Sequence, residues 1–389
     1  MGILPVIDES TAELTEIFKD LHAHPEIGFT EVRTSAIVAE KLREYGVDEV
    51  HEGIGKTGVV GIIKGKGGGN RRVGLRADMD ALPIHEETGL PYASQNAGVM
   101  HACGHDSHTT MLLGAAKHLA ETRDFDGTAV LIFQPAEEGL GGARGMLADG
   151  LFEKFPCDEV YGMHNWPNGE PKKFGIVKGA AMAGASFFDI HIKGKGSHGA
   201  RPEDSRDPLV IAASLTGDLQ TIVSRNMSPL DACVVSVTQL HAGSAYNVVP
   251  DTATLAGTIR YFKDEVCEKA ERRMKELCDG FALAYGVEIT CETRNIFNVL
   301  QNDADLSDAY MEAAGDIVGT DNVMLRDEPV MGSEDFADML RTIPGAYCTL
   351  GHGGNVPVHN PKFQIDPGIL PVGASIMARI VEKRLPLAG

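Results

Sequence analysis

Residues 128–139 read TAVLIFQPAEEG and join an apolar strand to a polar turn. The first six residues form a continuous apolar run, which is typical of a strand buried inside a sheet. The run ends in two adjacent carboxylates, Glu137 and Glu138. Because open α/β sheets bind ligands at the carboxyl ends of their strands, this stretch predicts an α/β domain with a functional site at that edge.

The sequence on both sides of this stretch repeats the strand and helix alternation. Apolar runs predict further strands at residues 58–63, 72–76, 159–163 and 346–351. Helical spacing predicts helices at 33–45, from Asp106 onward, at 141–149 and at 370–384. Strands that alternate with helices indicate an α/β sheet domain. The glycine-rich residues 65–70, GKGGGN, predict a hairpin turn between strands 58–63 and 72–76.

The pattern changes over residues 185–294. Phe188, Ile190 and Ile192 alternate with polar residues, which predicts a half-buried strand. The segment then predicts the order β-α-β-β-α-β, with a long helix whose apolar stripe runs from Val266 to Ala284. That order is the ferredoxin-like unit. We therefore expect an α/β domain formed by residues 1–184 and 295–389, interrupted by a smaller α+β domain of residues 185–294.

Composition excludes several classes of partner. The chain has 389 residues and a formal net charge of −20, which disfavours nucleic acid and anionic membrane surfaces. Its apolar runs are far shorter than the roughly 20 residues that a membrane span requires, and the first ten residues show no secretory pattern. Seven cysteines without CxxC pairs suit a reducing compartment, so we expect a cytoplasmic protein.

Residues 100–108, MHACGHDSH, concentrate metal-ligand chemistry in a short loop. Cys103 lies among three histidines, His101, His105 and His108. Thiolate and imidazole are the ligands that zinc and related ions prefer, so the loop predicts metal binding. The alternative is that Asp106 caps the following helix and that the imidazoles are incidental.

Other predicted strand ends carry further donors. At Glu137 and Glu138, one carboxylate can ligate a metal while the other accepts a proton from an activated water. The alternative is that both stabilise the N-terminus of the next helix. His164 follows the strand at 159–163, and His359 lies in the loop after the strand at 346–351. Each histidine alone could be structural, but four sheet-edge loops with suitable donors together predict a metal site.

Two weaker features remain. Asp78 and Asp80 follow the strand at 72–76, where one of them could orient a ligating histidine or merely form a turn. Residues 194–199, GKGSHG, match the dinucleotide pattern G-x-G-x-x-G. Prolines at 202 and 208 follow closely, so no helix N-terminus is expected there to receive a pyrophosphate.

Taken together, these motifs resemble the zinc-type aminoacylase and carboxypeptidase metallohydrolase family. Within it they are similar to the branch of hippurate hydrolases, N-acyl-L-amino-acid amidohydrolases and plant indole-acetyl-amino-acid hydrolases. The resemblance spans residues 12–385 and is strongest where residues 100–108 combine with the Glu137–Glu138 pair. The matching segments are 21–26, 74–84, 100–108, 133–138, 161–166, 246–251, 331–336 and 359–361.

The resemblance implies a role for each matching residue. Two divalent metal ions (Zn, Mn, Co or Ni) would be held by five ligands: Cys103, His105, Glu138, His164 and His359. Cys103 would occupy the bridging position, and Glu137 would be the general base. The inserted domain would be a lid and dimerisation domain. Its His198 would reach the active site of the partner subunit, while Asn247 and Arg260 would hold the substrate carboxylate.

The implied activity is hydrolysis of the amide bond of N-acyl amino acids, with hippurate-like or N-acetyl compounds as small-molecule substrates and a homodimer as the assembly. Relatives often carry a histidine soon after the proline that follows the His198 segment, whereas this chain has Pro202-Glu203, so lid contacts there are expected to differ. The alternatives are a dipeptidase or N-acetyl-diaminopimelate deacetylase of the same family, a nucleotide-dependent oxidoreductase, and a non-catalytic metal-binding module.

Overall fold

The computed structural model describes residues 2–387, and these form two compact units. The first comprises the residues up to Ala181, Leu300–Pro329 and those from Asp335 onward. The second comprises Met182–Val299 and Val330–Glu334, so it extends a few residues beyond the expected range 185–294 and adds a short returning segment. Within residues 2–387, no helix is both long and apolar enough to cross a membrane.

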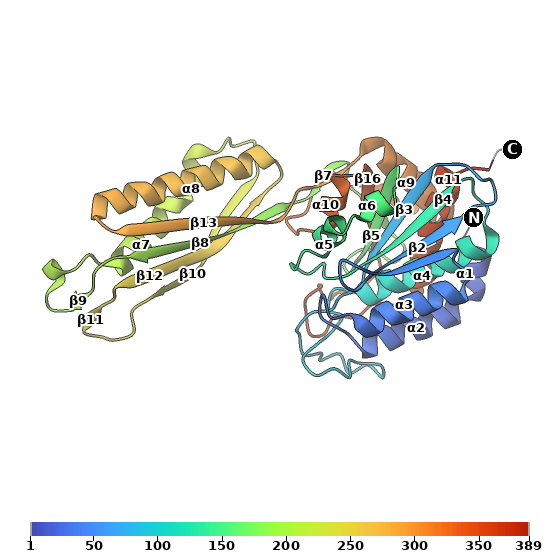
Figure 1. The fold of residues 1–389 in the computed structure, drawn as a ribbon, viewed down its shortest axis with the longest axis horizontal. Helices are drawn as coiled ribbons and strands as arrows, with labels where there is room; N and C mark the ends of the chain where they lie inside the picture. Colours follow the sequence, from blue (N-terminus) through green and yellow to red (C-terminus); the bar gives the residue numbers. More distant parts are fainter. Residues whose placement is uncertain (1, 388–389) are drawn as a thin grey trace. The chain divides into compact units, whose positions relative to one another are not determined.

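The first unit is built on an eight-stranded mixed sheet (Figure 1). Its strand order is β1-β2-β4-β3-β5-β16-β6-β15, with β4, β3, β5 and β16 running parallel. The sheet strands are β1 (Glu49–Ile54), β2 (Gly58–Lys64), β3 (Arg72–Asp78), β4 (Thr128–Gln134), β5 (Glu159–Trp166), β6 (Phe174–Ile176), β15 (Val323–Leu325) and β16 (Gly345–Gly351). A separate two-stranded sheet pairs β7 (Gly179–Met182) with β14 (Leu300–Asn302).

Helices cover both faces of the large sheet. One face packs on the main apolar core, to which α1 (Pro5–Glu9), α2 (Thr11–Ala23), α3 (Val32–Glu44), α4 (His105–Thr122), α9 (Ala304–Val318) and α11 (Leu370–Arg384) contribute. Figure 1 shows α2, α3 and α4 lying together on this side. On the other side lie α5 (Gly142–Ala148), α6 (Leu151–Lys154) and α10 (Phe336–Leu340). Because both faces are covered, β3 and β4 are buried along almost their whole length.

The predicted hairpin at residues 65–70 is wrong. Strands β2 and β3 do not pair, because β4 lies between them and binds β2 antiparallel and β3 parallel. The glycines instead let the connection pass close to the loop that precedes β4: a Cβ at Gly65 would lie 2.1 Å from the carbonyl oxygen of Phe125. Strand β1 was not predicted at all, since it is a largely exposed edge strand without apolar alternation.

The second unit has the order β-α-β-β-α-β that its sequence predicts, within a four-stranded antiparallel sheet ordered β10-β12-β8-β13. Its elements are β8 (Gly184–Lys193), α7 (Pro208–Thr221), β10 (Cys233–Ala242), β12 (Thr252–Tyr261), α8 (Asp264–Tyr285) and β13 (Glu288–Phe297), with the short pair β9 (Ser197–His198) and β11 (Val248–Val249). Helices α7 and α8 contact each other and pack on the sheet (Figure 1).

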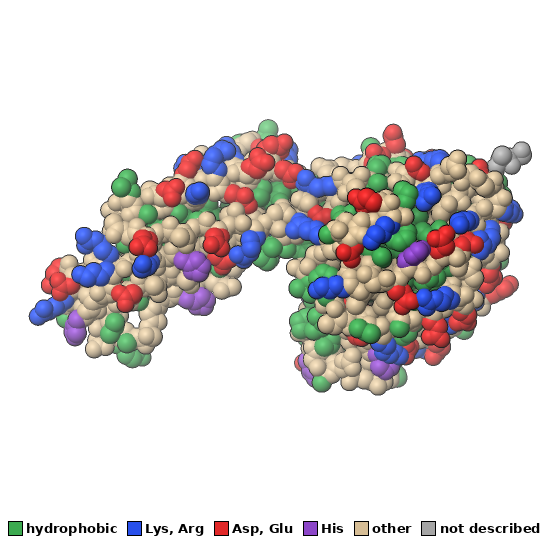
Figure 2. All heavy atoms as spheres, in the orientation of Figure 1, with side chains coloured by type: hydrophobic (Ala, Val, Ile, Leu, Met, Phe, Trp, Pro, Cys, Tyr) green, Lys and Arg blue, Asp and Glu red, His purple; other side chains and the backbone are tan. Residues whose placement is uncertain are grey.

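The buried stripe of α8 is shorter than the sequence predicts. Val266, Ala270 and Met274 are buried against the sheet, but Ala284 is exposed. Two cysteines, Cys267 and Cys278, complete the inner face instead. On the face shown in Figure 2, acidic and basic side chains are interspersed over both units.

Candidate metal centre

The carboxyl ends of four adjacent parallel strands position the candidate site. Strand β3 leads to Asp80, and β4 leads to Glu137 and Glu138. Strand β5 carries His164 near its end, and the loop after β16 carries His359. Cys103 and His105 stand where the loop that follows β3 enters α4. Because parallel strands end at one edge of the sheet, residues far apart in the sequence meet there.

The structure brings all five predicted ligands together. Cys103 Sγ lies 3.4 Å from His164 Nε2, and His359 Nε2 lies 3.2 Å from Glu138 Oε1. Two groups share Cys103: one adds His105 and His164, the other adds Glu138 and His359, and the ligand atoms of each group lie within 4.8 Å of one another. Donors about 2.0–2.3 Å from a common ion are separated by such distances. Cys103 therefore stands where two three-residue clusters join.

Hydrogen bonds on the far side of two imidazoles orient them. His105 Nδ1 lies 2.9 Å from the carbonyl oxygen of Asp80 and 3.2 Å from its Oδ1, so it donates there. His164 Nδ1 donates to the carbonyl oxygen of Asn165 at 2.7 Å. Each ring thus turns Nε2 toward Cys103, and the buried Nε2 of His105 has no hydrogen-bond partner. An imidazole held by Nδ1 with Nε2 left over is typical of a metal ligand.

The charges in the cluster favour the deprotonated, ligating forms of Cys103 and Glu138. Burial raises the pKa of the Cys103 thiol, but the neighbouring His164 and His105 imidazoles outweigh burial and lower that pKa to about 7. Burial raises the pKa of Glu138, and its contact with His359 outweighs that and lowers it. A thiolate and a carboxylate at one edge of the sheet attract a cation.

Glu137 lies beside the cluster, with its ligand atom within 4.8 Å of those of His105 and Glu138. Its side chain is 6% exposed. The Asp80 carboxylate accepts the backbone amides of Glu137 at 2.9 Å and of Glu138 at 3.0 Å. One aspartate therefore orients His105 and also the turn that carries both glutamates.

Two histidines of residues 100–108 do not join the five. His108 uses both ring nitrogens, with Nδ1 2.6 Å from Asp78 Oδ1 and Nε2 accepting the amide of Asn165 at 2.9 Å. His101 is buried, and neither of its ring nitrogens has a hydrogen-bond partner. Of the three histidines in this loop, only His105 joins the five-residue cluster, while His108 forms a further group with Asp78 and His105 that could hold an ion.

Sequence reasoning missed the buried Arg76, which stands behind Asp78. Its side chain is fully buried and donates to Asp78 Oδ2 at 2.7 Å and to Gln134 Oε1 at 2.9 Å. Asp78 in turn holds His108. The signal was a charged residue inside the otherwise apolar strand β3, where a buried arginine requires such partners.

The remaining predicted residues lie in the second unit. His198 is exposed on β9 opposite Val248, and the carbonyl oxygen of Asn247 accepts the amide of Gly199 at 2.7 Å. Arg260 lies on β12 opposite Ala185 of β8 and donates to Ser333 Oγ at 2.5 Å.

Arg260 lies in the four-stranded sheet and His198 in the separate β9–β11 pair, near opposite ends of strand β8. Arg260 pairs near the start of β8, whereas His198 follows the end of β8 at Lys193. At about 3.3 Å per residue, the two ends of that strand are separated by roughly 26–30 Å. His198 and Asn247 are neighbours, and Arg260 stands apart from them.

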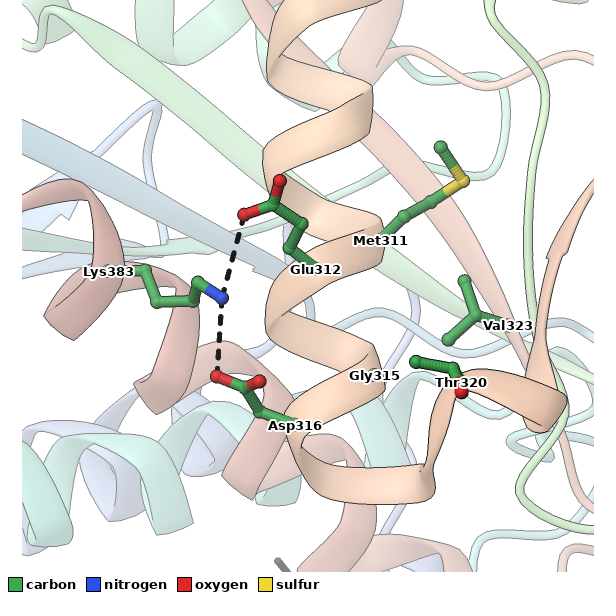
Figure 3. Close-up of a pocket in the computed structure, with 7 residues that line it drawn as sticks. All are labelled: Met311, Glu312, Gly315, Asp316, Thr320, Val323 and Lys383. Carbon is green, nitrogen blue, oxygen red and sulfur yellow. Dashed lines mark hydrogen bonds and ion pairs between the residues drawn. The ribbon is translucent and has the colours of Figure 1, made fainter.

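Two other features do not supply a competing site. The G-x-G-x-x-G segment at 194–199 leads into β9 and a single 3₁₀ turn, and α7 begins only at Pro208. A surface pocket has a volume of about 410 Å³. Its lining residues, drawn in Figure 3, are Met311, Glu312, Gly315, Asp316, Thr320, Val323 and Lys383. The only basic side chain among these lining residues, Lys383, forms ion pairs with Glu312 at 3.6 Å and with Asp316 at 3.3 Å. None of the five clustered donors lines this pocket.

The fold and the cluster define a metallohydrolase-like site, and comparison with known proteins gives the family. The family described as Peptidase family M20/M25/M40 matches residues 74–383, and the chain belongs to it. The family resemblance drawn from the motifs is thereby confirmed.

Individual relatives resemble the chain over its whole length. It is 43% identical to hippurate hydrolase of Campylobacter jejuni, over 99% of this chain and 100% of the relative. It is 38% identical to N-acetylcysteine deacetylase of Bacillus subtilis, over 94% of this chain and 95% of the relative. The crystal structure of Bacillus subtilis YXEP, described as a dinuclear metal binding peptidase, superposes with a TM-score of 0.85 at 34% identity, covering 98% of this chain and 100% of that one. The predicted α/β class is confirmed, and its large sheet is mixed.

Proposed function

We propose that this protein is a metal-dependent amidohydrolase that cleaves the amide bond of N-acyl amino acids. Water adds to the acyl carbon, the carbon–nitrogen bond breaks, and a carboxylic acid and a free amino acid leave. The observation that carries the proposal is the convergence of five donors, with Cys103 shared between two groups, beside the carboxylate of Glu137. The hippurate hydrolase and N-acetylcysteine deacetylase relatives support this substrate class.

The residues present fit a pair of divalent ions. Cys103, His105, Glu138, His164 and His359 would hold them, and the buried Nε2 of His105, which makes no hydrogen bond, is one atom that an ion would satisfy. Thiolate, imidazole and carboxylate donors suit Zn, Mn, Co or Ni. Ions bound there supply Lewis-acid chemistry, which polarises a carbonyl group and makes a water molecule more acidic.

Glu137 is the group of this chain that moves the proton. Its carboxylate accepts a proton from the attacking water and delivers it to the amine nitrogen as the carbon–nitrogen bond breaks. The Glu137 side chain is buried beside His105 and Glu138. It is therefore close enough to act on a water molecule at the cluster, and the five proposed ligands do not include it. Asp80 holds its backbone amide and so fixes where the side chain begins.

The second unit would serve as a lid and as the dimerisation surface, with His198, Asn247 and Arg260 as substrate-binding groups. His198 and Arg260 lie near opposite ends of strand β8, so one substrate contacts both more readily if two chains contribute. This separation supports a homodimer in which His198 polarises the scissile carbonyl in the partner's site. Arg260 would bind the substrate carboxylate together with Asn247, which lies beside His198 and would come from the same chain as that histidine.

The test is a hydrolysis assay of metal-stripped protein reconstituted with one ion at a time. The panel contains hippurate, N-acetylcysteine and other N-acetyl amino acids, a dipeptide and N-acetyl-diaminopimelate. Hydrolysis of N-acyl amino acids that depends on added metal supports the proposal. Exclusive cleavage of the dipeptide or of N-acetyl-diaminopimelate would reassign the substrate, and no metal-dependent hydrolysis of any compound would refute the proposal.

A further inference from the structure

Three consecutive backbone amides before and within the glutamate pair donate to two buried carboxylates. Ala136 donates to Glu31 Oε1 at 2.8 Å, and the next two amides donate to Asp80. Asp80 belongs to the site already described, because it also holds His105. The Glu31 carboxylate accepts hydrogen bonds from Thr57 and Ala136, not from any of the five proposed metal ligands. It lies 105 residues before Ala136 in the sequence. Its role is therefore a separate question.

The backbone of Ala136 explains why an acceptor is needed there. Its φ is +53°, in the left-handed region that residues with a Cβ atom rarely adopt. Such a conformation persists only when the surroundings determine it. The conformation lies between Pro135, which follows β4, and Glu137, so it sets the direction in which the two glutamate side chains leave the strand.

The surroundings of Glu31 fix its carboxylate in the position that accepts the Ala136 amide. Its side chain is fully buried, and its second oxygen, Oε2, accepts the hydroxyl of Thr57 at 2.6 Å. The same segment presses on Ala136 from another side: a Cβ at Gly28 would lie 2.8 Å from Ala136 Cα and 2.9 Å from its Cβ. Only glycine at position 28 permits this approach. Glu31 and Gly28 thus confine Ala136 together.

Helix capping does not account for Glu31. It stands at the N-cap position of α3, but its side chain makes no capping hydrogen bond. Glu26 does that work, because its carboxylate accepts the amides of Arg33 at 3.0 Å and Thr34 at 2.8 Å. Burial of a carboxylate costs solvation free energy. The hydrogen bond from Ala136 accounts for a buried carboxylate at this position, whereas capping of α3 does not.

We propose that Glu31, supported by Gly28, is a positioning residue that holds Ala136 in its left-handed conformation and thereby directs Glu137 and Glu138 into the ligand cluster. The inference rests on the proposed function, since it assigns Glu31 to the reaction through Glu137. Misplacement of a reacting group by about 1 Å can cost roughly a hundredfold in rate. Loss of Glu31 should therefore lower kcat far more than it changes KM.

Four variants test this role, with steady-state kinetics, metal content and thermal unfolding measured for each. Glu31→Ala should lower kcat ~10- to 100-fold with KM changed less than about threefold. Glu31→Gln keeps an oxygen that accepts the Ala136 amide, so it should retain most of the activity. Glu26→Ala is the matched control: it should lower the unfolding temperature and leave kcat within about twofold. Adding Ala136→Gly to Glu31→Ala should restore part of kcat, because glycine adopts positive φ without steric cost.

Hydrogen exchange provides a readout that does not depend on activity. Amides in residues 134–140 should exchange faster in Glu31→Ala than in wild type, and should be unchanged in Glu26→Ala. This result would establish the positioning role even if the wild type hydrolysed no N-acyl amino acid, an outcome that would remove only the proposed function. Should Glu31→Ala fail to fold, Gly28→Ala replaces it, because its methyl group pushes on Ala136 while Glu31 stays in place.

The inference is overturned by any of three results. The first is unchanged exchange of residues 134–140 in Glu31→Ala or its Gly28→Ala replacement. The second is a kcat loss in Glu26→Ala equal to that in Glu31→Ala, which would show a general effect of destabilising α3. The third is no recovery of kcat on adding Ala136→Gly, which would show that Glu31 does not act through the backbone of Ala136.

Discussion

The sulfur of Cys103 lies 3.4 Å from Nε2 of His164, although 61 positions separate the two residues in the chain. The contact joins the loop before α4 to the end of β5. It also couples their titration: burial lowers the pKa of His164, and the negative charge of Cys103 outweighs burial and raises that pKa to about 9. A cation between the two would replace this proton-dependent attraction with direct ligation.

Replacing Cys103 with alanine should remove bound metal and activity together, because both three-residue clusters lose the donor that they share. Metal content measured by elemental analysis after dialysis checks this. Cys157→Ala is the matched control, since Cys157 is also a buried cysteine of the first unit but donates its hydrogen bond to the carbonyl oxygen of Phe155, away from the cluster. Full metal content in Cys103→Ala would remove Cys103 from the ligand set.

Glu137→Gln and Glu138→Gln should fail in different ways. The first should keep its metal and lose ~10²- to 10⁴-fold or more in kcat, because the amide cannot accept a proton. The second should lose metal affinity, because Glu138 contacts His359 and shares a cluster with Cys103. Metal titration beside steady-state kinetics separates the two effects. An active Glu137→Gln enzyme would exclude Glu137 as the base.

Removing metal with a chelator should lower the thermal unfolding temperature, since a ligand bound only by the folded state stabilises it by mass action. Adding back Zn, Mn, Co or Ni should restore the temperature in the wild type. In Cys103→Ala the temperature should respond weakly to both treatments. A chelated wild type that unfolds at an unchanged temperature would argue against metal held by this cluster.

His22 should make stability depend on pH. Burial lowers its pKa, but hydrogen bonds to Asp106 at 2.7 Å and Glu86 at 3.2 Å outweigh burial and raise the pKa to about 10. The unfolded value is about 6.5. The stabilisation is therefore fully present below pH 6.5 and is lost as the pH rises through about 10.

Unfolding temperatures of wild type and His22→Gln measured from pH 6 to pH 10 test this. The wild type should lose several degrees more than the variant over that range. His51→Gln, at a histidine whose side chain is 41% exposed, is the control and should follow the wild type. Parallel pH profiles for wild type and His22→Gln would contradict the assignment.

His198 should act on the partner's site. His198→Ala and Glu137→Gln are each expected to be nearly inactive alone. In mixed dimers, the site that keeps Glu137 would receive His198 from the other chain, so random exchange should restore activity to about a quarter of the sites. Activity of the mixture measured after subunit exchange checks this, and no recovery despite proven exchange would place His198 in its own chain's site or outside the reaction.

The sequence could bring the candidate ligands to attention because each has a chemically distinct side chain close to a recognisable strand or helix end. The apolar run of β4 followed by Glu137 and Glu138, and the loop that holds Cys103 and His105, are local signals. The prediction of a hairpin at residues 65–70 was wrong because a glycine-rich connection is not a specific signal. It can join two strands that pair directly, or two strands that have a third strand between them in the sheet. Only the pairing of β4 with both neighbours decides between them.

The sequence by itself determined the four central parallel strands of the first unit, the β-α-β-β-α-β order of the second, the family and the chemical type of each donor, since periodicity and residue chemistry are local. The tertiary structure alone decided which histidines remain available. His108 is consumed by Asp78 and Asn165, whereas His105 keeps Nε2 for the cluster. The tertiary structure also decided that Glu31 contacts Ala136. A contact between residues 105 positions apart depends on how the chain packs, and the local sequence around either residue does not indicate it.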